Sequence, residues 1–582
     1  MNYVSVNNRN WVFRKFDNNY ALSLSEKFSL KEITSKLLAI RNIKNIDHFL
    51  NPTIKNSMPN PTLLKDMDVA IERTIKNITG KKTIGIFGDY DVDGATSTAL
   101  LTKYFLEIKQ KINFYIPDRK KDGYGPNIRG FNELIDKGSS VIFTVDCGTS
   151  SFDPISFSQE KGVDVIVLDH HQADTKLPEA CAIVNPNRVD DSSGLNYLSA
   201  AGVCFMFLAA LNIKLRDIKW FEKSKINEPN ILNYLDLVCL GTVCDVSPLI
   251  GLNRAIVSQG LKILKKRNNL GLKTLYDICD IQTHPNVYHL GYILGPRINA
   301  GGRVGKSSHG AELLISKDLK KIFQIASDLN AYNKERQDIE RKLLYEVDLK
   351  ANKISSDPLL ILSDNNWHEG VMGIVASRIK EKYNKPTIII SFNGNEGKGS
   401  ARSIFGFDIG SSIIAAVQSK ILLKGGGHKM AGGFSLEKKN LEQFKNFLFD
   451  KFKKSNLDQI KNKNLYLDSI IAPTALNEDF YNDINLLSPF GSGNPEPRFV
   501  IENLKIVKTT ILKQKHIKTV MYATNGQVIK GIAYNCIDTP MQNYLISKNK
   551  VLNIAGKISL NEWLGKRDFE FIIEDVSVEK IN

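Results

Sequence analysis

Four apolar segments of the chain each run directly into an aspartate, and this repetition constrains the fold strongly. TIGIFG precedes Asp89, VIFTV precedes Asp146 and VDVIVL precedes Asp169. These three segments are short, apolar and separated by helical patterns, which predicts parallel strands joined by helices. LDLVCLGTVC, which precedes Asp245, is a fourth apolar run. We therefore predict an α/β protein built on a parallel sheet.

The aspartates at the ends of these segments predict a metal site. The carboxyl ends of parallel strands meet at one edge of the sheet, where ligands bind. Carboxylates gathered there repel one another unless cations lie among them. Oxygen ligands with one or two imidazoles and no thiolate suit Mn²⁺ or Mg²⁺, and two such ions about 3.5–4 Å apart can drive in-line hydrolysis of a phosphoester. The side chains concerned are Asp89, Asp91, Asp93, Asp146, Asp169, His170, His171 and Asp245.

Composition indicates a globular protein that stays inside the cell. Of 582 residues 42% are hydrophobic and 24% are charged, which excludes a disordered chain. The net charge of +16 fits a polyanionic partner such as nucleic acid, although an AT-rich genome would also enrich lysine. Seven cysteines without a C-x-x-C pair indicate reduced thiols and no zinc site. Without a signal peptide or an apolar run of about 20 residues, we expect a cytoplasmic protein.

The periodicity of apolar residues divides the rest of the chain. The first 60 or so residues are expected to be helical. Residues 317–354 contain no Gly or Pro and carry apolar residues at helical spacing, which predicts a long exposed helix between domains. A second α/β unit is expected from Pro358 to about Lys454. From about Asn464 strand-like runs follow one another, which is typical of a small β-barrel such as an OB-fold.

The motifs resemble those of the DHH phosphoesterase superfamily, which is named for its Asp-His-His sequence. Within it the match is to the RecJ family of single-strand-specific DNA exonucleases, and it covers nearly the whole chain. The motifs that carry the resemblance occur in the family's order: GDYDVDGATSTALL, IPDRKKDGYG, TVDCGTS, VLDHHQ, GTVCDVSPL, GPRINAGGRVG, WHEGVMGIVASRI, KGSARSI, GGGHKMAGGF and SPFGSGNPEPRF.

The resemblance implies an architecture and an activity. The activity is hydrolysis of single-stranded DNA from the 5′ end to mononucleotides with two Mn²⁺ or Mg²⁺ ions, in recombination and repair. Single-stranded DNA, a helicase and a single-strand-binding protein are the expected partners of a monomer. The domains would surround a hole that admits one strand and excludes duplex. Their expected order is an N-terminal helical segment (1–60), a DHH catalytic domain (61–315), a bridging helix (316–354), a DHHA1 domain (355–455) and an OB-fold domain (462–582).

The resemblance also implies roles for individual residues. The metal ligands would be Asp91, Asp93, Asp146, His170 and Asp245, with Asp89 as a further acid. The catalytic side chains would be His171, Asp93 and Asp146. The groups expected to hold the 5′-phosphate are Arg119, Ser400 and Arg402, and those expected to line the substrate channel are Arg297, Asn299, Arg303 and His428.

Some of these roles also make sense from the residues themselves. Ser400 and Arg402 are two apart in an extended segment, which puts both side chains on one face, and a guanidinium suits bidentate phosphate contact. Glycines around His428 would let backbone N–H groups approach a phosphate, although a simple tight turn is the alternative. Barrel aromatics such as Tyr522, Tyr534 and Trp563 could stack on bases or fill the core.

Two other functions are compatible with parts of the sequence. One is a DHH phosphoesterase acting on short RNA, cyclic dinucleotides, pyrophosphate or polyphosphate. Such enzymes share the metal motifs but are usually shorter and lack the SPFGSGNPEP segment. The other is a non-catalytic protein that only grips single strands. The complete set of metal ligands argues against this second alternative.

Overall fold

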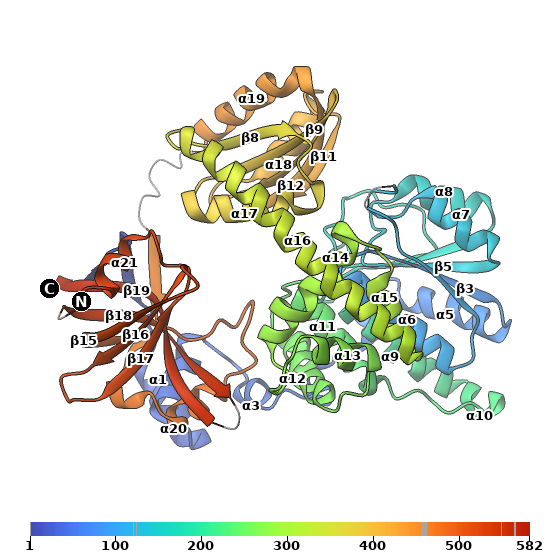
Figure 1. The fold of residues 1–582 in the computed structure, drawn as a ribbon. Helices are drawn as coiled ribbons and strands as arrows, with labels where there is room; N and C mark the ends of the chain where they lie inside the picture. The colour runs from blue at the N-terminus through green and yellow to red at the C-terminus, as the bar shows by residue number, and fades with distance from the viewer. Residues whose placement is uncertain are drawn as a thin grey trace.

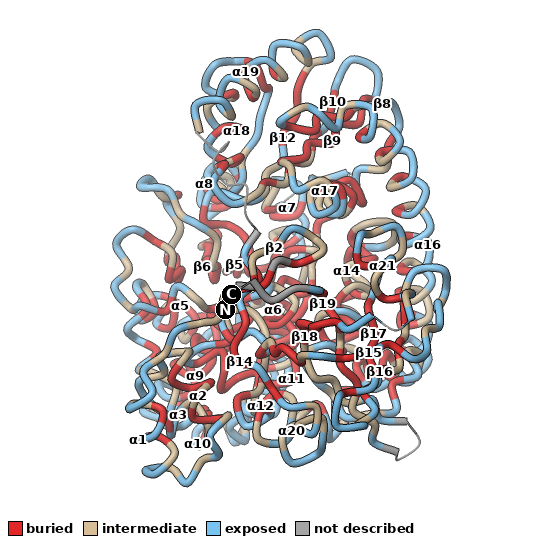
Figure 2. Tube along the Cα trace, turned by 90° about the vertical axis from the view of Figure 1, so that its left-hand side faces the viewer, coloured by how far each residue is buried: buried red, intermediate tan, exposed pale blue. Residues whose placement is uncertain are grey.

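Three bodies make up the protein in the computed structural model, which describes residues 2–119, 121–123, 125–455, 463–548, 550–563 and 566–581. Figure 1 shows an α/β body, a smaller α/β body above it and a β-barrel body beside them. Figure 2 shows buried residues gathered around the sheets and central helices and exposed residues at the periphery. In the described residues, no helix combines the length and apolar character that a membrane crossing requires.

The first body is built on five parallel strands in the order β4-β3-β5-β6-β7. Helices cover both faces because successive strand residues point to opposite sides. Phe143 of β5 packs with α5, α6 and α9, whereas Ile142 packs with α7 and α8. The predicted α/β class is therefore confirmed. The bounds are β3 Thr83–Gly88, β4 Ile112–Tyr115, β5 Ser139–Val145, β6 Asp164–Leu168, β7 Ala182–Val184, α5 Met67–Thr79, α6 Val92–Glu107, α7 Ile128–Asp136, α8 Phe152–Glu160 and α9 Ala200–Asp217.

A helical layer follows the sheet in the same body. The apolar run before Asp245 forms helix α11, which is buried from Leu235 to Val243, so its continuous hydrophobicity reflects a helix enclosed on all sides. A π-helical segment, η3, leads without a break into α14. The bounds are α10 Trp220–Ser224, α11 Leu235–Cys244, α12 Gly251–Lys265, α13 Leu270–Ile278, η3 His289–Leu294, α14 Gly295–Val304 and α15 His309–Ile315.

The bridging helix is α16 (Leu319–Lys353), close to the predicted bounds. It differs from the expectation of an exposed helix, because one stripe of it is buried in two separate cores. Ile325 and Leu329 pack in the first body, whereas Leu343 and Val347 pack in the second. The helix therefore fixes the two bodies to each other.

The second body is a five-stranded sheet in the order β11-β12-β10-β9-β8, in which only β8 and β9 pair in parallel. Helix α17 packs on one face together with the end of α16, and α18 and α19 cover the other face. The bounds are β8 Leu360–Asn365, α17 Glu369–Tyr383, β9 Thr387–Asn393, β10 Glu396–Arg402, α18 Ile409–Gln418, β11 Lys424–His428, β12 Ala431–Glu437 and α19 Leu441–Lys453.

The third body contains a closed barrel. Strand β15 pairs with β16, β16 with β17, β17 with β19, β19 with β18, and β18 with β15, so the circuit has no free edge. The predicted small barrel is confirmed. The bounds are β13 Lys463–Leu467, β14 Ser469–Ile470, α20 Glu478–Asn485, β15 Phe499–Leu512, β16 His516–Tyr522, β17 Val528–Ala533, α21 Pro540–Leu545, β18 Val551–Trp563 and β19 Lys566–Ile581.

The first residues of the chain extend this barrel sheet rather than forming helices. Strand β1 (Asn2–Ser5) pairs with β19, and β2 (Arg9–Phe13) pairs with β1 and β13. Trp11 donates a hydrogen bond of 2.9 Å to Asp575, and buried Tyr3 packs against the Trp11 ring. The helices expected in this region begin only afterwards, at α1 Asn18–Phe28, α2 Glu32–Ile40, α3 Ile46–Leu50 and α4 Ile54–Ser57.

The SPFGSGNPEP segment joins the barrel body to the first body. Buried Arg254 of α12 donates hydrogen bonds to the carbonyl oxygens of Leu487, Ser488, Pro489 and Phe49 at 2.7–3.3 Å. Its guanidinium also lies 3.7 Å from the centre of the Phe49 ring. A cavity of about 520 Å³ lies at this junction. Arg254 thus connects helix α12 with Phe49 and with residues 487–489 through hydrogen bonds.

Candidate active site

Three adjacent parallel strands carry the predicted acids to one edge of the first sheet. Asp89 follows β3, Asp146 follows β5 and Asp169 follows β6, and all three side chains are buried. Asp146 has a φ of 61°, in the left-handed region that aspartate tolerates better than most residues. The convergence predicted from the strand ends is therefore present.

Asp91 and Asp93 are positioned by backbone N–H groups. Asp91 caps the N-terminus of α6 and accepts a hydrogen bond of 3.0 Å from the N–H of Gly94. Buried Asp93 accepts hydrogen bonds of 2.7 and 3.0 Å from the N–H groups of Ala200 and Ala201. Those two groups belong to the first turn of α9, where the helix dipole favours a negative charge. Asp93 is thereby fixed facing the sheet edge.

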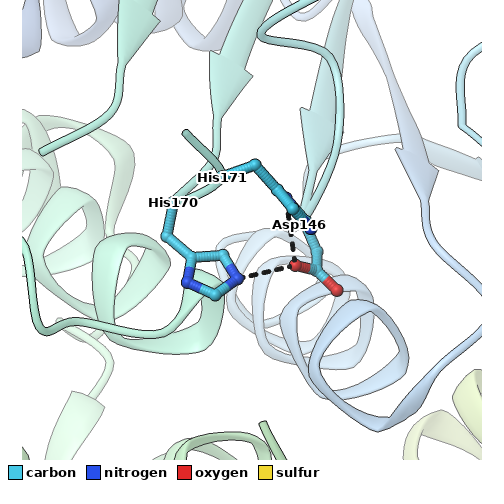
Figure 3. Close-up of side chains that lie close together, drawn as sticks. All are labelled: Asp146, His170 and His171. Carbon is cyan, nitrogen blue, oxygen red and sulfur yellow. Dashed lines mark ion pairs between the residues drawn. The ribbon is translucent and has the colours of Figure 1, made fainter. Parts of the chain in front are cut away.

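His170 lies among three of the acids. Its Nε2 is 3.3 Å from Oδ1 of Asp146 and 3.9 Å from Oδ2 of Asp93. Its Nδ1 is 3.8 Å from Oδ2 of Asp245. Figure 3 shows the side chains of His170 and His171 both close to the Asp146 carboxylate, with an ion pair drawn from each. One imidazole therefore connects the acid at the end of β5 with the acid at the end of α11.

Asp245 completes the cluster from the helical layer. It follows the last residue of α11, and its side chain is 26% exposed, more than those of the sheet-edge acids. Ser247 donates a hydrogen bond of 2.5 Å to its Oδ2. This carboxylate therefore lies where the buried cluster opens toward solvent.

His171 is oriented by Asp169. Its Nδ1 lies 2.8 Å from Oδ1 of Asp169, whose Oδ2 accepts hydrogen bonds from the N–H and hydroxyl of Thr149 at 3.1 and 2.7 Å. Burial alone would lower the pKa of His171, but its hydrogen bond to Asp169 and the surrounding carboxylates raise this pKa to about 9. Burial opposes ionisation of Asp169, but its bonds to His171 hold its pKa below the ordinary range.

The carboxylates of Asp89, Asp93 and Asp146 repel one another when they are all ionised. Burial, followed by the charge of the neighbouring aspartates, raises the pKa of Asp89, Asp93 and Asp146 well above the ordinary range. Oδ1 of Asp89 and Oδ2 of Asp146 are buried and have no hydrogen-bond partner among the described residues. Buried, unpartnered carboxylate oxygens of this kind need a cation or a proton.

The donor set fits divalent cations. Three groups of side chains bring one ligand atom each to within 4.8 Å of one another. All donors are carboxylate oxygens and imidazole nitrogens, which is the set expected for Mn²⁺ or Mg²⁺. The groups are Asp89, Asp91 and Asp146; Asp146, His170 and His171; and Asp93, His170 and Asp245.

Two of the predicted phosphate-binding residues share one face of β10 in the second body. Ser400 and Arg402 alternate with buried Ala401, and Nη1 of Arg402 lies 3.2 Å from the Ser400 hydroxyl. Arg119 comes from the first body, where its guanidinium lies 5.6 Å from the centre of the Tyr90 ring. Burial and then the charge of Arg119 lower the pKa of Arg402, so the two bodies bring these cations together.

Helix α14 contributes further predicted residues at the same junction. Arg303 donates a hydrogen bond of 2.9 Å to the carbonyl oxygen of Gly370 at the start of α17. Burial and the charges of Arg119 and Arg336 lower the pKa of Arg303 to about 10. Arg303 therefore belongs to the same group of cations as Arg119 and Arg402, and such a group suits an anion.

Arg297, Asn299 and His428 are less directly connected to this group. Arg297 donates to Oδ1 of Asn330 at 2.9 Å and to the carbonyl oxygen of Ile293 at 2.7 Å, and Asn299 is half-buried on α14. Exposed His428 ends β11 and pairs with Ala431, which pairs with Arg402 on the next strand. The GGGH segment lies in the extended edge strand β11, and a two-residue turn at Lys429 and Met430 follows it.

The sequence did not single out the polar cluster inside α16. Arg336 donates to Asn333 and Glu340 at 2.8 and 2.6 Å, and Arg378 of α17 pairs with Glu340 at 2.6 Å. Arg336 and Glu340 are four residues apart, but this spacing is common on solvated helices. Only their burial, at 9% and 2% exposed, shows that they cross the junction between the bodies.

Comparison with known families agrees with the three bodies. Residues 83–242 match the DHH family N-terminal domain, residues 356–454 the DHHA1 domain and residues 467–575 the RecJ OB domain. The parallel sheet with its acid and histidine edge therefore belongs to the DHH class of proteins, and a DHHA1 domain follows it.

Curated relatives extend the match over the whole chain. The single-stranded-DNA-specific exonuclease RecJ of Bacillus subtilis is 30% identical over 98% of this chain and 71% of its own length. The protein of the same name from Salmonella typhimurium is 33% identical over 94% of this chain and 96% of its own length. The crystal structure of Thermus thermophilus RecJ with Mn²⁺ aligns with a TM-score of 0.81 and 25% identity, over 98% of this chain and 80% of that one. The chain belongs to the RecJ family.

Proposed function

We propose that this protein is a single-stranded-DNA-specific exonuclease that removes mononucleotides from the 5′ end by metal-dependent phosphodiester hydrolysis. The observation that carries the proposal is the cluster around His170, in which five carboxylates and two imidazoles form three overlapping groups of candidate metal ligands. The relatives named above are described as single-stranded-DNA-specific exonucleases.

The side chains divide the chemical work between them. When bound, two divalent cations would polarise the phosphoryl oxygens and make water a better nucleophile. Asp146 would help to hold the ions, because it belongs to two of the three ligand groups. The other ligands would be Asp91, Asp93, His170 and Asp245, with Asp89 in support.

His171 and its partner are suited to handle a proton or the scissile phosphate. With a raised pKa, the imidazole is cationic at neutral pH and can donate to a phosphoryl oxygen. Asp169 occupies the Nδ1 side of the ring and so fixes the orientation of the imidazole. We expect Asp93 to help hold the reacting water.

The arginine group would determine which end of the DNA strand enters the active site. Arg119, Ser400 and Arg402 would bind the phosphate of the first nucleotide, so that the strand enters by its 5′ end. Arg303, Arg297, Asn299 and His428 would line the approach. We further expect a cytoplasmic monomer that acts with a helicase and a single-strand-binding protein in recombination and repair, within the domain boundaries given above.

The test compares substrates at equal phosphodiester concentration. With Mn²⁺, the proposal predicts acid-soluble product from a single strand, little from blunt duplex and none in EDTA. Turnover of cyclic dinucleotides or pyrophosphate without digestion of DNA would instead assign the metal site to another DHH phosphoesterase. Binding of single strands with no hydrolysis of any phosphoester would leave only a binding protein.

A further inference from the structure

Two tyrosines stand side by side on the surface just before α14. Tyr288 is 61% exposed and Tyr292 is 73% exposed. Their ring centroids are 5.2 Å apart and their planes differ by 25°, which is a stacked pair. Stacked aromatic pairs usually contribute to a core or an interface, so a pair this exposed points to a ligand.

The two tyrosines lie on one continuous helical segment. Tyr288 precedes the π-helical segment η3 (His289–Leu294), which contains Tyr292. Side chains four residues apart lie on the same side of a helix, and π-helical turns occur often at functional sites. The two rings therefore project from one side of a single helical run.

A fixed cation lies beside the tyrosines. Arg297, one turn further along, donates a hydrogen bond of 2.7 Å to the carbonyl oxygen of Ile293, the residue after Tyr292. Its Nε donates to Asn330 at 2.9 Å. Within the described residues Arg297 forms no ion pair, so its positive charge stays uncompensated by protein carboxylates. An aromatic stack next to such a charge has the chemistry of a single-strand binding site.

A third exposed tyrosine approaches from the barrel. Tyr534 follows β17, is 53% exposed and meets the His516 ring edge-on at 5.3 Å between centroids. Burial, Glu570 and the Tyr288 phenol raise the pKa of Tyr534. The Tyr288 and Tyr534 hydroxyls are thus near enough to interact electrostatically, although they belong to different bodies.

We propose that Tyr288 and Tyr292 form a base-stacking site for single-stranded DNA, with Arg297 on the sugar–phosphate backbone. The inference rests on the proposed function, because it assigns a path to the part of the strand beyond the terminal linkage. Every base offers a π-face, so the site would not select sequence. It would increase affinity for strands long enough to reach it.

The experiment measures binding and hydrolysis separately on strands of 2 to 20 nucleotides. Binding is followed by fluorescence anisotropy in EDTA, so that no turnover is needed. In the double variant Tyr288→Ala/Tyr292→Ala, the Kd for 20-nucleotide strands should rise by about fivefold or more, while the Kd for dinucleotides stays unchanged. In Mn²⁺ the KM should show the same length dependence, with kcat unchanged.

Two control variants separate the loss of the stacked rings from a general change in the protein surface. Tyr288→Phe/Tyr292→Phe keeps both rings and should retain the wild-type Kd. Tyr466→Ala removes a tyrosine that is 47% exposed on β13, an edge strand of the barrel sheet, and should change nothing. An unchanged Kd for long strands in the alanine double variant would overturn the stacking site. A normal length-dependent Kd in a wild-type protein that fails to hydrolyse DNA would overturn the proposed function alone.

Discussion

The Nδ1 atom of His171 lies 2.8 Å from Oδ1 of Asp169, two residues earlier in the chain. The backbone N–H groups of His170 and His171 donate to the same oxygen at 2.7 and 3.2 Å, and Thr149 holds the other oxygen through two hydrogen bonds. The carboxylate is saturated with donors, so it acts as a rigid support for the imidazole rather than as a free metal ligand.

Replacing Asp169 should therefore impair catalysis through His171. Asp169→Asn keeps the shape but removes the charge that orients and protonates the ring. We expect kcat to fall by about 10- to 100-fold. The kcat–pH profile should also change, because the His171 pKa, now about 9, would fall toward its ordinary value. Asp174→Asn, an exposed neighbour, serves as the matched control; equal losses in both variants would contradict the positioning role.

We expect Asp146 to lower the stability of the metal-free protein although it is needed for metal binding. The pKa of Asp146 is raised in the folded protein. Below the unfolded-state pKa of about 3.9 the carboxyl is protonated in both states, so it adds no pH-dependent term to the free energy of unfolding. As the pH rises from there toward the folded-state pKa, Asp146 lowers that free energy progressively. Metal-free protein should therefore be less stable at pH 8 than at pH 5. Asp146→Asn should raise the Tm in EDTA at pH 8 by several degrees, because it removes one charge from the cluster.

The same variant should lose its response to metal. In the wild-type protein Mn²⁺ should raise the Tm, since it binds the folded state. In Asp146→Asn that increase should largely disappear, together with hydrolysis. Differential scanning calorimetry in EDTA and in Mn²⁺ measures both effects. A variant that is less stable in EDTA yet still stabilised by Mn²⁺ would show that Asp146 has only a structural role.

Arg402 predicts a preference for a phosphorylated 5′ end. Arg402→Gln should raise the KM for 5′-phosphorylated strands by about 10-fold or more, the loss expected for a charge-assisted phosphate contact. The KM for 5′-hydroxyl strands should change little. Lys398→Gln removes another cation from the same strand, one that pairs with Glu369 at 2.9 Å, and is the control. An equal effect on both kinds of strand would rule out a specific contact with the 5′-phosphate.

Replacing Arg254 should lower the stability of the protein without lowering its catalytic rate. Arg254→Met would remove a donor from four backbone carbonyl oxygens, of which those of Leu487 and Pro489 keep a hydrogen bond from Asn494, at a cost of about 2–4 kcal/mol in the free energy of unfolding. Urea denaturation should show this loss, while kcat below the transition stays near wild type. Lys262→Met, an exposed change on the same helix, should leave stability nearly unchanged.

Residues at strand ends were predictable because sheet geometry is repetitive. Asp89, Asp146 and Asp169 each follow an apolar run, and parallel strands bring such positions to one edge whatever the connections between them. Ser400 and Arg402 were paired on one face by the alternation of a single strand, and the structure agrees. These inferences needed only local periodicity.

Other features have no local signal. Asp93 is held by the backbone N–H groups of Ala200 and Ala201, which any residue could supply. β1 pairs with β19 at the opposite end of the chain, and a strand of four residues, NYVS, does not indicate so distant a partner. The buried Arg336–Glu340–Arg378 cluster looks like an ordinary charged helix surface until α17 is packed against it.

The most direct test of the central claim follows the release of single nucleotides with Mn²⁺ from a strand of about 40 nucleotides labelled at either end. The account predicts that a 5′ label appears at once as mononucleotide, that a 3′ label shortens stepwise, and that a blocked 5′ end or EDTA stops both. Immediate release of the 3′ label, or internal cuts in a strand blocked at its 5′ end, would contradict it.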